Sequence, residues 1–411
     1  MPKRLLFVDD ETNILDGLRR ALHGMRGDWE MQFVDSAPAA LLALEEKPFD
    51  AVISDMRMPQ MDGAQLLELV KQRHPDVIRV VLSGQSSQES VLRSVAPAHQ
   101  FLSKPCDPQE LVARLSQAFA MRDLLSNQSL KTLVSRLRSV PSLPIIYGEL
   151  MEALRTEDPS IARIERIISK DVGMAAKILQ LANSAFIGAR GRVSNLLQAV
   201  SLIGTETVRT LVLSVHVFSQ FDANSEIAAL LPALWEHSVS SASLAQKIAQ
   251  AECGTKAMVE ESFTAGLLHD IGKVVLLAEL PREYLPILGQ ISDVIAPLEV
   301  ERLGCTHAQV GAYLVSIWGL PVPLVRAVAF HHCPAEAGEM QFSSLTAVHA
   351  ADALVGAADL SPINHDGQLD LNYLERLGLS KRIETWRTFP EAQILTKAEG
   401  ASGERKDSVC R

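Results

Sequence analysis

Three carboxylates, a hydroxyl and an ammonium each stand directly after a short apolar run. These residues are Asp9, Asp10, Asp55, Ser83 and Lys104. If the runs are strands of one parallel sheet, their carboxyl ends lie along one edge, where such sheets bind ligands. Carboxylates gathered in one place need a cation, and Mg²⁺ suits oxygen ligands and phosphate groups. The set therefore has the parts needed to transfer a phosphoryl group to an aspartate.

Each of these residues, taken alone, also fits an ordinary solvated side chain at the end of a strand. It is their occurrence at successive strand ends that favours a phosphoryl-transfer site.

A second group of chemically capable residues lies in the other half of the chain. Eight of the eleven histidines lie beyond residue 200. Imidazole and carboxylate ligands together suit Fe, Mn or Zn, and open positions on such an ion would make water nucleophilic. A lone histidine on an apolar helix is more often a core residue, so it is the whole set that indicates a metal site. The set consists of His237, His269, Asp270, His307, His331, His332 and Asp352.

The elements that must position these residues differ between the two halves. In the first half, five short apolar runs alternate with helical patterns, which predicts a doubly wound parallel sheet. The strands are expected at 5–8, 31–34, 51–53, 80–82 and 101–102, and the helices at 14–22, 39–46, 66–73, 87–95 and 109–121. Beyond these, helical periodicity dominates to about residue 385. The fold class is thus α/β followed by all-α.

Four segments are expected along the chain. Helical periodicity continues past 121 until Pro141 and Pro144 interrupt it, which predicts a semi-rigid connector. The C-terminal stretch is polar and contains Gly and Ser, which indicates partial disorder. The segments are a first domain at 1–122, a connector helix at 123–140, a helical domain at 141–385 and a C-terminal extension at 386–411.

Length, charge and cysteine usage narrow the class of protein. A chain of 411 residues predicts two or three domains. The net charge of −10 argues against direct DNA binding, and we see no helix-turn-helix with a basic recognition helix. Five scattered cysteines without a C-x-x-C pair suit a reducing compartment. With no leader and no membrane-spanning run in the sequence, we expect a cytoplasmic protein.

Residues 1–122 resemble the response-regulator receiver family. The resemblance rests on the acidic pair, the stretch Val52-Ile53-Ser54-Asp55-Met56-Arg57-Met58-Pro59 and the stretch Phe101-Leu102-Ser103-Lys104-Pro105. It implies a flavodoxin-like (βα)5 fold, Mg²⁺, and a sensor histidine kinase or phosphotransfer protein as partner. The roles it implies are metal binding by Asp9, Asp10 and the Arg57 carbonyl, phosphoryl acceptance by Asp55, switching by Ser83 and Phe101, and phosphoryl contact by Lys104.

The helical half resembles the HDOD branch of the HD superfamily of metal-dependent phosphohydrolases. Its motifs include Ile178-Leu179-Gln180-Leu181-Ala182-Asn183-Ser184 and Ala265-Gly266-Leu267-Leu268-His269-Asp270-Ile271-Gly272-Lys273. The resemblance implies a first metal on His237, His269, Asp270 and Asp352, a second on Asp270, His307, His331 and His332, and a phosphate contact from Lys273. Val172 departs from the family, which usually carries proline there.

Two functions follow from the HDOD resemblance. HDOD domains are mostly regarded as signalling modules, so the leading hypothesis is a phosphorylation-controlled regulator whose output binds a downstream protein or a nucleotide ligand. The alternative is a receiver-gated phosphohydrolase acting on a nucleotide or cyclic dinucleotide. The related HD-GYP branch carries Gly-Tyr-Pro after its His-His pair, whereas here Cys333-Pro334-Ala335 follows. The sequence leaves dimer formation open.

Overall fold

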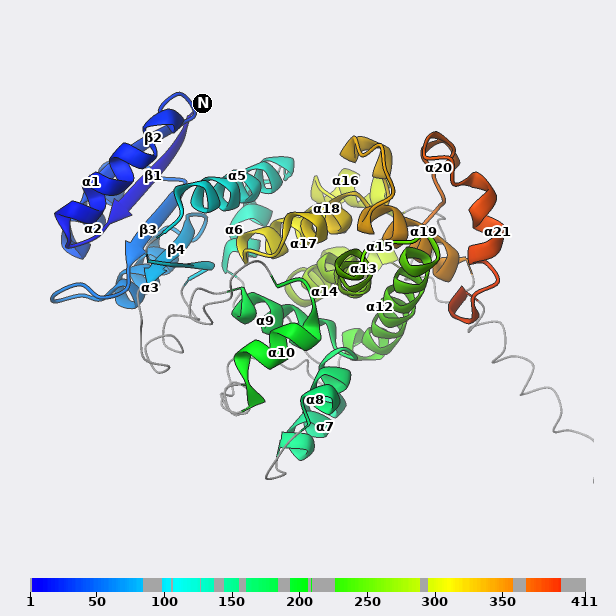
Figure 1. The fold of residues 1–411 in the computed structure, drawn as a ribbon. Coiled ribbons are helices and arrows are strands. Elements are labelled where there is room, and N and C mark those ends of the chain that lie inside the picture. Colours follow the sequence, from blue (N-terminus) through cyan, green and yellow to red (C-terminus); the bar gives the residue numbers. More distant parts are fainter. Residues whose placement is uncertain are drawn as a thin grey trace, which may run out of the picture.

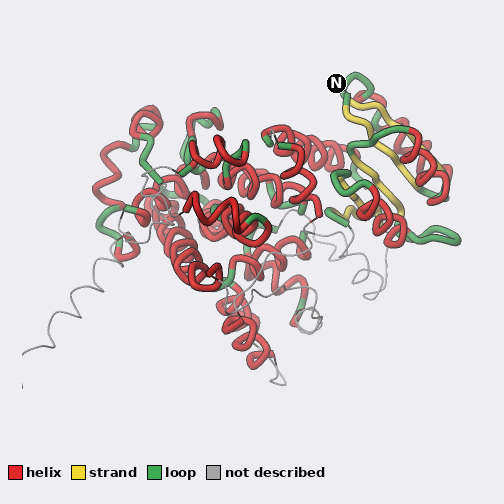
Figure 2. Tube along the Cα trace, turned by 180° about the vertical axis from the view of Figure 1, so that it is seen from behind, coloured by secondary structure: helices red, strands yellow, loops and turns green. Residues whose placement is uncertain are grey.

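The computed structural model describes most of the chain as two packed parts, one α/β and one helical (Figures 1 and 2). The described residues are 2–83, 98–104, 106–125, 127–136, 144–154, 160–183, 193–205, 208, 226–288, 295–357 and 367–392. The predicted helix at 87–95 and most of the C-terminal extension, 393–411, lie outside them. Within the described residues no helix is long and apolar enough to cross a membrane.

The first part is a five-stranded parallel sheet in the order β2-β1-β3-β4-β5. Its strands are β1 (Lys3–Val8), β2 (Trp29–Val34), β3 (Ala51–Asp55), β4 (Ile78–Ser83) and β5 (Gln100–Ser103), all five where the sequence predicts them. Its helices are α1 (Thr12–Ala21), α2 (Ala37–Glu46), α3 (Gly63–Arg73) and α5 (Pro108–Leu124), with a 3-10 turn at His23–Met25.

Consecutive buried residues explain why this sheet carries helices on both faces. Leu5, Leu6, Phe7 and Val8 are all at most 1% exposed. Successive side chains of a strand point to opposite faces, so both faces of β1 must be covered. The doubly wound prediction is confirmed.

The second part is all helical in the described residues. Its helices are α6 (Gln128–Arg136), α7 (Pro144–Leu154), α8 (Ile161–Ile168), α9 (Val172–Ala182), α10 (Leu196–Ile203), α12 (Glu226–Ala251), α13 (Lys256–Leu268), α14 (Ile271–Glu279), α15 (Pro281–Leu288), α16 (Ala296–Leu303), α17 (His307–Ile317), α18 (Val322–Phe330), α19 (Ser344–Gly356), α20 (Leu371–Arg376) and α21 (Ile383–Trp386). Short 3-10 turns lie at Pro334–Ala337, Ser380–Arg382 and Pro390–Ala392. The core consists of α12, α13, α14, α17, α18 and α19, which pack on one another.

Two expected segment boundaries differ in the structure. The connector expected at 123–140 is not one continuous helix with α5, because α5 ends at Leu124, where Leu125 adopts an extended conformation, and α6 starts afresh at Gln128. Residues 137–140 lie outside the described chain. The extension expected from 386 begins later, because Trp386 is fully buried and its indole N–H donates to Glu252 Oε1 (3.0 Å).

The two parts are joined by direct contacts as well as by the chain. Helices α5 and α6 pack against α17 (Figure 1). The Gln100 side chain, on β5, donates from Nε2 to the carbonyl oxygen of Ser316 on α17 (3.0 Å). The hydroxyls of Ser135 (α6) and Tyr313 (α17) lie 2.8 Å apart. Helix α17 therefore meets the sheet domain, and α6 does so as well, because the Ser135 carbonyl accepts from the Arg79 guanidinium (2.7 Å).

Candidate functional sites: an acidic strand-end site and a histidine–aspartate centre

Lys104 brings the carboxylates of two strand ends together. Its Nζ donates to Asp9 Oδ2 (2.7 Å) and forms an ion pair with Asp55. Asp9 and Asp55 are buried, at 1% and 6% exposure. Burial lowers the pKa of Lys104, but the hydrogen bonds and charges of Asp55 and Asp9 outweigh it and raise that pKa. The ammonium therefore stays charged between the two carboxylates.

The remaining acidic residue lines a cavity beside this ion pair. Asp10 is exposed and, with Arg57 and Met58, lines a cavity of about 490 Å³. The Arg57 backbone N–H donates to Asp55 Oδ2 (2.6 Å), which turns the chain after β3 toward the same cavity. Ser83 ends β4 and Phe101 lies on β5, as predicted, but their side chains fall outside the described part of the structure.

Gly63 allows α3 to start against β3. A Cβ on Gly63 would overlap the backbone carbonyl oxygen of Asp55. The Asp62 carboxylate accepts from the Gln65 N–H (2.8 Å), and the Gln65 side chain accepts from the Asp62 N–H (3.1 Å), so a capping box fixes this helix start. Only glycine permits this approach without displacing the strand end that carries Asp55.

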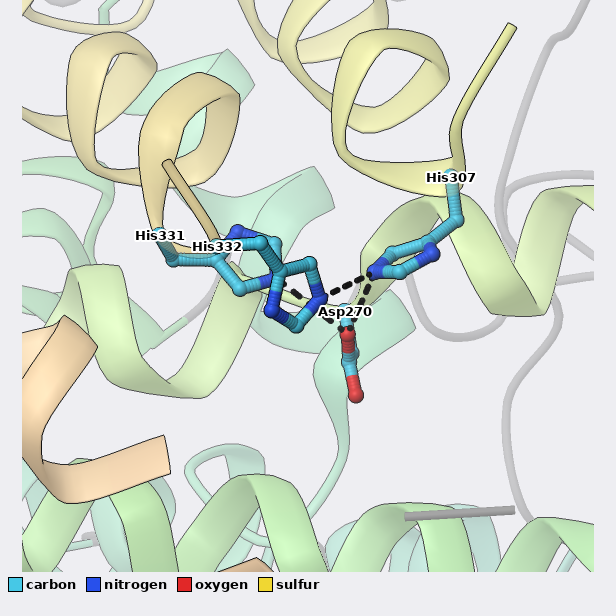
Figure 3. Close-up of side chains that lie close together, drawn as sticks. All are labelled: Asp270, His307, His331 and His332. Atoms are coloured by element: carbon cyan, nitrogen blue, oxygen red, sulfur yellow. Dashed lines mark hydrogen bonds and ion pairs between the residues drawn. The ribbon is translucent and has the colours of Figure 1, made fainter. Parts of the chain in front are cut away.

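In the helical part, the seven predicted ligand residues lie in two adjacent groups from five helices or helix ends. One group is His237, His269 and Asp352, and the other is Asp270, His307, His331 and His332. The ligand atoms within each group all lie within 4.8 Å of one another. Figure 3 shows His331 and His332, after α18, facing His307 at the start of α17, with Asp270 beside them.

The two aspartates connect these groups. Asp352 Oδ1 lies 3.0 Å from His237 Nε2 and 3.3 Å from His269 Nε2. Asp270 Oδ1 lies 3.3 Å from His307 Nε2, and its Oδ2 lies 3.4 Å from His269 Nε2. Asp270 therefore faces both groups, in agreement with its implied place in both ligand sets. The Lys273 Nζ donates to Asp270 Oδ2 (2.8 Å).

Backbone carbonyls hold two of the imidazole rings in one orientation. His269 Nδ1 donates to the Gly266 carbonyl (2.6 Å), and His331 Nδ1 donates to the Val328 carbonyl (2.9 Å). With Nδ1 occupied, each ring presents Nε2 to the centre. Outer partners of this kind are typical of metal-bound histidines.

Several buried atoms of the centre have no hydrogen-bond partner among the described residues. They include His237 Nδ1, His269 Nε2, His331 Nε2, Asp270 Oδ1 and Asp352 Oδ2. Buried polar atoms without a partner are costly. Nitrogen and carboxylate oxygen atoms that converge in this way fit a transition-metal ion, so the residues present fit the metal that the resemblance implies.

The carboxylates of the centre are ionised, but its imidazoles differ in charge. Against the effect of burial, Asp270 and Asp352 raise the pKa of His269, and Glu299 and Asp270 raise the pKa of His307 to about 10, so both rings must lose a proton to bind a metal. Burial raises the pKa of Asp270, but His269 and Lys273 outweigh it and hold that pKa well below its ordinary value. Burial likewise raises the pKa of Asp352, but the hydrogen bonds from His237 and His269 outweigh burial and lower that pKa. Burial and the neighbouring imidazoles keep the pKa of His331 well below its usual range, so this ring is neutral at pH 7. Ionised carboxylates and a neutral imidazole are the forms that bind metals.

The centre is closed to solvent. His269, His307 and His331 are fully buried, His237, Asp270 and Asp352 are 1% exposed, and the His332 side chain, at 14%, is the most exposed of the seven. His349 lies outside the centre, where its Nδ1 donates to the His331 carbonyl (2.7 Å) and its Nε2 accepts from the Asp370 N–H (2.9 Å). This is the core role expected of a lone histidine.

Two residues outside the predicted ligand set support the centre. A Cβ on Gly272 would overlap the carbonyl oxygen of His307, so this glycine allows α14 to approach α17 and brings Asp270 to His307. The carboxylate of Glu299 accepts from the His307 ring. The Gly272 role could have been suspected from its place two residues after Asp270, whereas Glu299 lies in an ordinary short helical pattern.

Comparison with known proteins assigns both parts of the chain. Residues 5–116 match the response regulator receiver domain, and residues 140–334 match the HDOD domain. An uncharacterized protein of Treponema pallidum (strain Nichols) is 25% identical over 259 residues, 62% of this chain and 48% of that protein. The hydrogenase transcriptional regulatory protein HoxA of Cupriavidus necator is 34% identical over 122 residues, 29% of this chain. The chain thus spans about half of the first relative's length, and 25% of HoxA.

Parts of the chain are also similar to solved structures. The signal receiver domain of an HD domain-containing protein from Pseudomonas fluorescens Pf-5 is 32% identical, with 29% of this chain and 96% of that chain covered and a TM-score of 0.28. The MmoQ response regulator from Methylococcus capsulatus is 24% identical, with 61% and 98% covered and a TM-score of 0.45. The chain therefore carries an N-terminal response regulator receiver domain at residues 5–116 and a C-terminal HDOD domain at residues 140–334.

Proposed function

We propose that the receiver domain accepts a phosphoryl group on Asp55, from a sensor histidine kinase or a phosphotransfer protein. The observation that carries this proposal is Lys104, whose ammonium contacts Asp9 and Asp55 beside the cavity that Asp10 lines. Asp9, Asp10, Asp55 and the Arg57 carbonyl would hold Mg²⁺, which supplies charge neutralisation on the phosphate oxygens. A carboxylate oxygen of Asp55 attacks phosphorus, the bond to the donor breaks, and Lys104 balances the charge of the acyl phosphate.

Acetyl phosphate with Mg²⁺ tests this assignment. The wild-type chain gains one phosphoryl group, and Asp55→Asn gains none because an amide oxygen is a poor nucleophile. Asp16→Asn is the matched control, because Asp16 is an exposed α1 aspartate that pairs with Arg19. Labelling that survives in Asp55→Asn places the acceptor elsewhere.

For the helical part, the donor set supports a centre of two metal ions. His237, His269, Asp270 and Asp352 would hold the first, and Asp270, His307, His331 and His332 the second, with Fe, Mn or Zn as the fitting elements. Such ions supply Lewis acidity and a nucleophilic water when a coordination position is open. The Lys273 ammonium is hydrogen-bonded to Asp270, so it would have to leave that carboxylate before it could contact a phosphate.

The closed centre favours output by binding over catalysis. Substrate must reach a metal ion to react, yet every proposed ligand except His332 is at most 1% exposed. In this conformation the ions would tie α12, α13, α17, α18 and α19 together and set the shape of a surface that a downstream protein or a ligand recognises. The complete ligand set supports the alternative, a phosphohydrolase that opens when the receiver is phosphorylated.

Control passes from receiver to output through α17 in this proposal. The C-terminal end of α17 accepts the hydrogen bond from Gln100, four residues before Lys104, and its first residue is His307. Phosphorylation of Asp55 withdraws Lys104 from its present carboxylate pair and alters β5. The population then shifts between two arrangements of α17.

Metal content and turnover separate the two output hypotheses. Purified wild type is analysed for Fe, Mn and Zn, and then assayed for release of phosphate and nucleotide, with and without the Asp55 phosphoryl group. Stoichiometric metal without turnover supports the binding module, whereas turnover that His269→Ala abolishes establishes the enzyme. Wild type without bound metal in any of these conditions refutes the metal centre.

A further inference from the structure

One carboxylate next to the proposed metal centre is fully buried and belongs to neither ligand group. Glu299, on α16, is 0% exposed. Its oxygens accept from His307 Nδ1 (2.9 Å), from the backbone N–H of His307 (2.9 Å) and from the hydroxyl of Tyr284 on α15 (2.7 Å). Three donors from two helices therefore hold this carboxylate.

The bond to Nδ1 decides which nitrogen His307 offers to a metal. With Nδ1–H donated to Glu299, the other nitrogen, Nε2, lies 3.3 Å from Asp270 Oδ1 and 3.1 Å from His332 Nε2. The same carboxylate accepts the first backbone N–H of α17, a group that has no partner within its own helix. Glu299 thus fixes both the ring and the start of the helix that carries it.

Glu299 differs from the partners of the other oriented rings. His269 and His331 donate Nδ1 to neutral backbone carbonyls of their own helices, whereas His307 donates to an ionised side chain from another helix. A carboxylate partner makes the imidazole a stronger ligand than a carbonyl does, and losing such a partner typically weakens metal binding.

We propose that Glu299 is a positioning residue that prepares His307 as a ligand of the second metal ion, and that Tyr284 holds Glu299 in place. This inference rests on the proposed metal centre. In this proposal the binding of the second ion depends on α15 and α16, although neither helix supplies a ligand. The binding of the first ion does not depend on them.

The test is a Mn²⁺ titration of the full-length chain, followed by EPR, after removal of bound metal and with excess Mg²⁺ present to occupy the receiver site. Wild type is expected to take up two ions that couple magnetically. Glu299→Gln is expected to keep the first ion and to bind the second about 10- to 100-fold more weakly, with loss of the coupled signal. Tyr284→Phe leaves the His307 bond in place and should weaken the second ion less, in the same direction.

Glu252→Gln is the matched control, because Glu252 accepts from Arg382 and Trp386 away from the centre, and both ions should bind as in wild type. Two ions bound with unchanged affinity in Glu299→Gln overturn the proposal. If that variant does not fold, unchanged affinity in Tyr284→Phe overturns it. Wild type that takes up no Mn²⁺ refutes the metal centre itself.

A second readout does not depend on metal. In ¹⁵N-histidine-labelled wild type, NMR should show a strongly hydrogen-bonded Nδ1–H on His307 that Glu299→Gln shifts. If wild type binds both ions but lacks this Nδ1–H signal, the positioning role of Glu299 is wrong while the proposed metal centre is still supported.

Discussion

The two sites of this chain handle charge in opposite ways. In the receiver, one lysine holds Asp9 and Asp55, and Asp10 faces an open cavity. In the HDOD domain, imidazoles surround Asp270 and Asp352, and further hydrogen bonds hold those rings in turn. A carboxylate balanced by one flexible side chain can exchange that partner for an ion and a phosphoryl group, whereas a buried and doubly held centre is suited to retaining the ions that we propose it binds.

The sites share one structural device. Each depends on a glycine at the start of a helix, where any added Cβ would collide with the backbone of another residue of the site. A Cβ on Gly63 would collide with Asp55, and a Cβ on Gly272 would collide with His307. In the receiver this contact sets the position of Asp55, the proposed nucleophile. In the HDOD domain it sets the distance between two proposed ligands, Asp270 and His307.

Removing transition metals should have the largest effect and should separate the sites. 1,10-Phenanthroline takes Fe and Zn but leaves Mg²⁺, so we expect the HDOD core to lose stability and the receiver to keep its phosphorylation. An ion present at about 1,000 times its Kd contributes about 4 kcal/mol. Hydrogen exchange should therefore accelerate in α13, α17 and α18 and remain slow in β1 and β3. Unchanged exchange in those helices would mean that no bound ion stabilises them.

The paired glycine substitutions should have a smaller effect and test the shared device. Gly272→Ala forces α14 away from α17, and overpacking of this kind costs about 1–3 kcal/mol or more. We expect weaker binding of the second ion and normal phosphorylation. Gly63→Ala should slow phosphorylation and leave metal content unchanged. Gly17→Ala, where a Cβ would meet nothing within 4 Å, is the control for both. If either glycine variant impairs both sites equally, the sites do not depend on separate local contacts.

The sequence predicted the receiver better than the HDOD centre because its site follows from local order. Alternating runs place strand ends along one edge, so Asp9, Asp55 and Lys104 could be brought together without knowing any helix packing. The seven HDOD ligands could be named, but their division into two groups depends on crossings among five helices. Glu299 lies in a short helix with exposed neighbours such as Val300, and no pattern marks it as buried. The Gln100–Ser316 contact joins residues 216 apart, beyond the reach of periodicity.

That contact carries the last and smallest prediction. Gln100 is 2% exposed, and Gln100→Leu keeps the volume while removing one hydrogen bond, a loss of about 1 kcal/mol. We expect phosphorylation and metal binding each to persist while the link between them weakens. The measurement is Mn²⁺ affinity with and without beryllofluoride, a phosphoryl analogue that binds at the acceptor aspartate, in excess Mg²⁺ that occupies the receiver site.

Coupling between two binding sites is reciprocal, so the factor by which beryllofluoride changes Mn²⁺ affinity must equal the factor by which Mn²⁺ changes beryllofluoride affinity. In wild type we expect this factor to differ from one, and in Gln100→Leu to move toward one. Gln72→Leu, an exposed α3 residue bonded to Glu68, should keep the wild-type value. A factor of one in wild type would show that the sites act independently, because α17 would then join the domains without transmitting the state of Asp55. If Gln100→Leu leaves this factor unchanged, the coupling between the sites is carried by the contacts of α5 and α6 with α17.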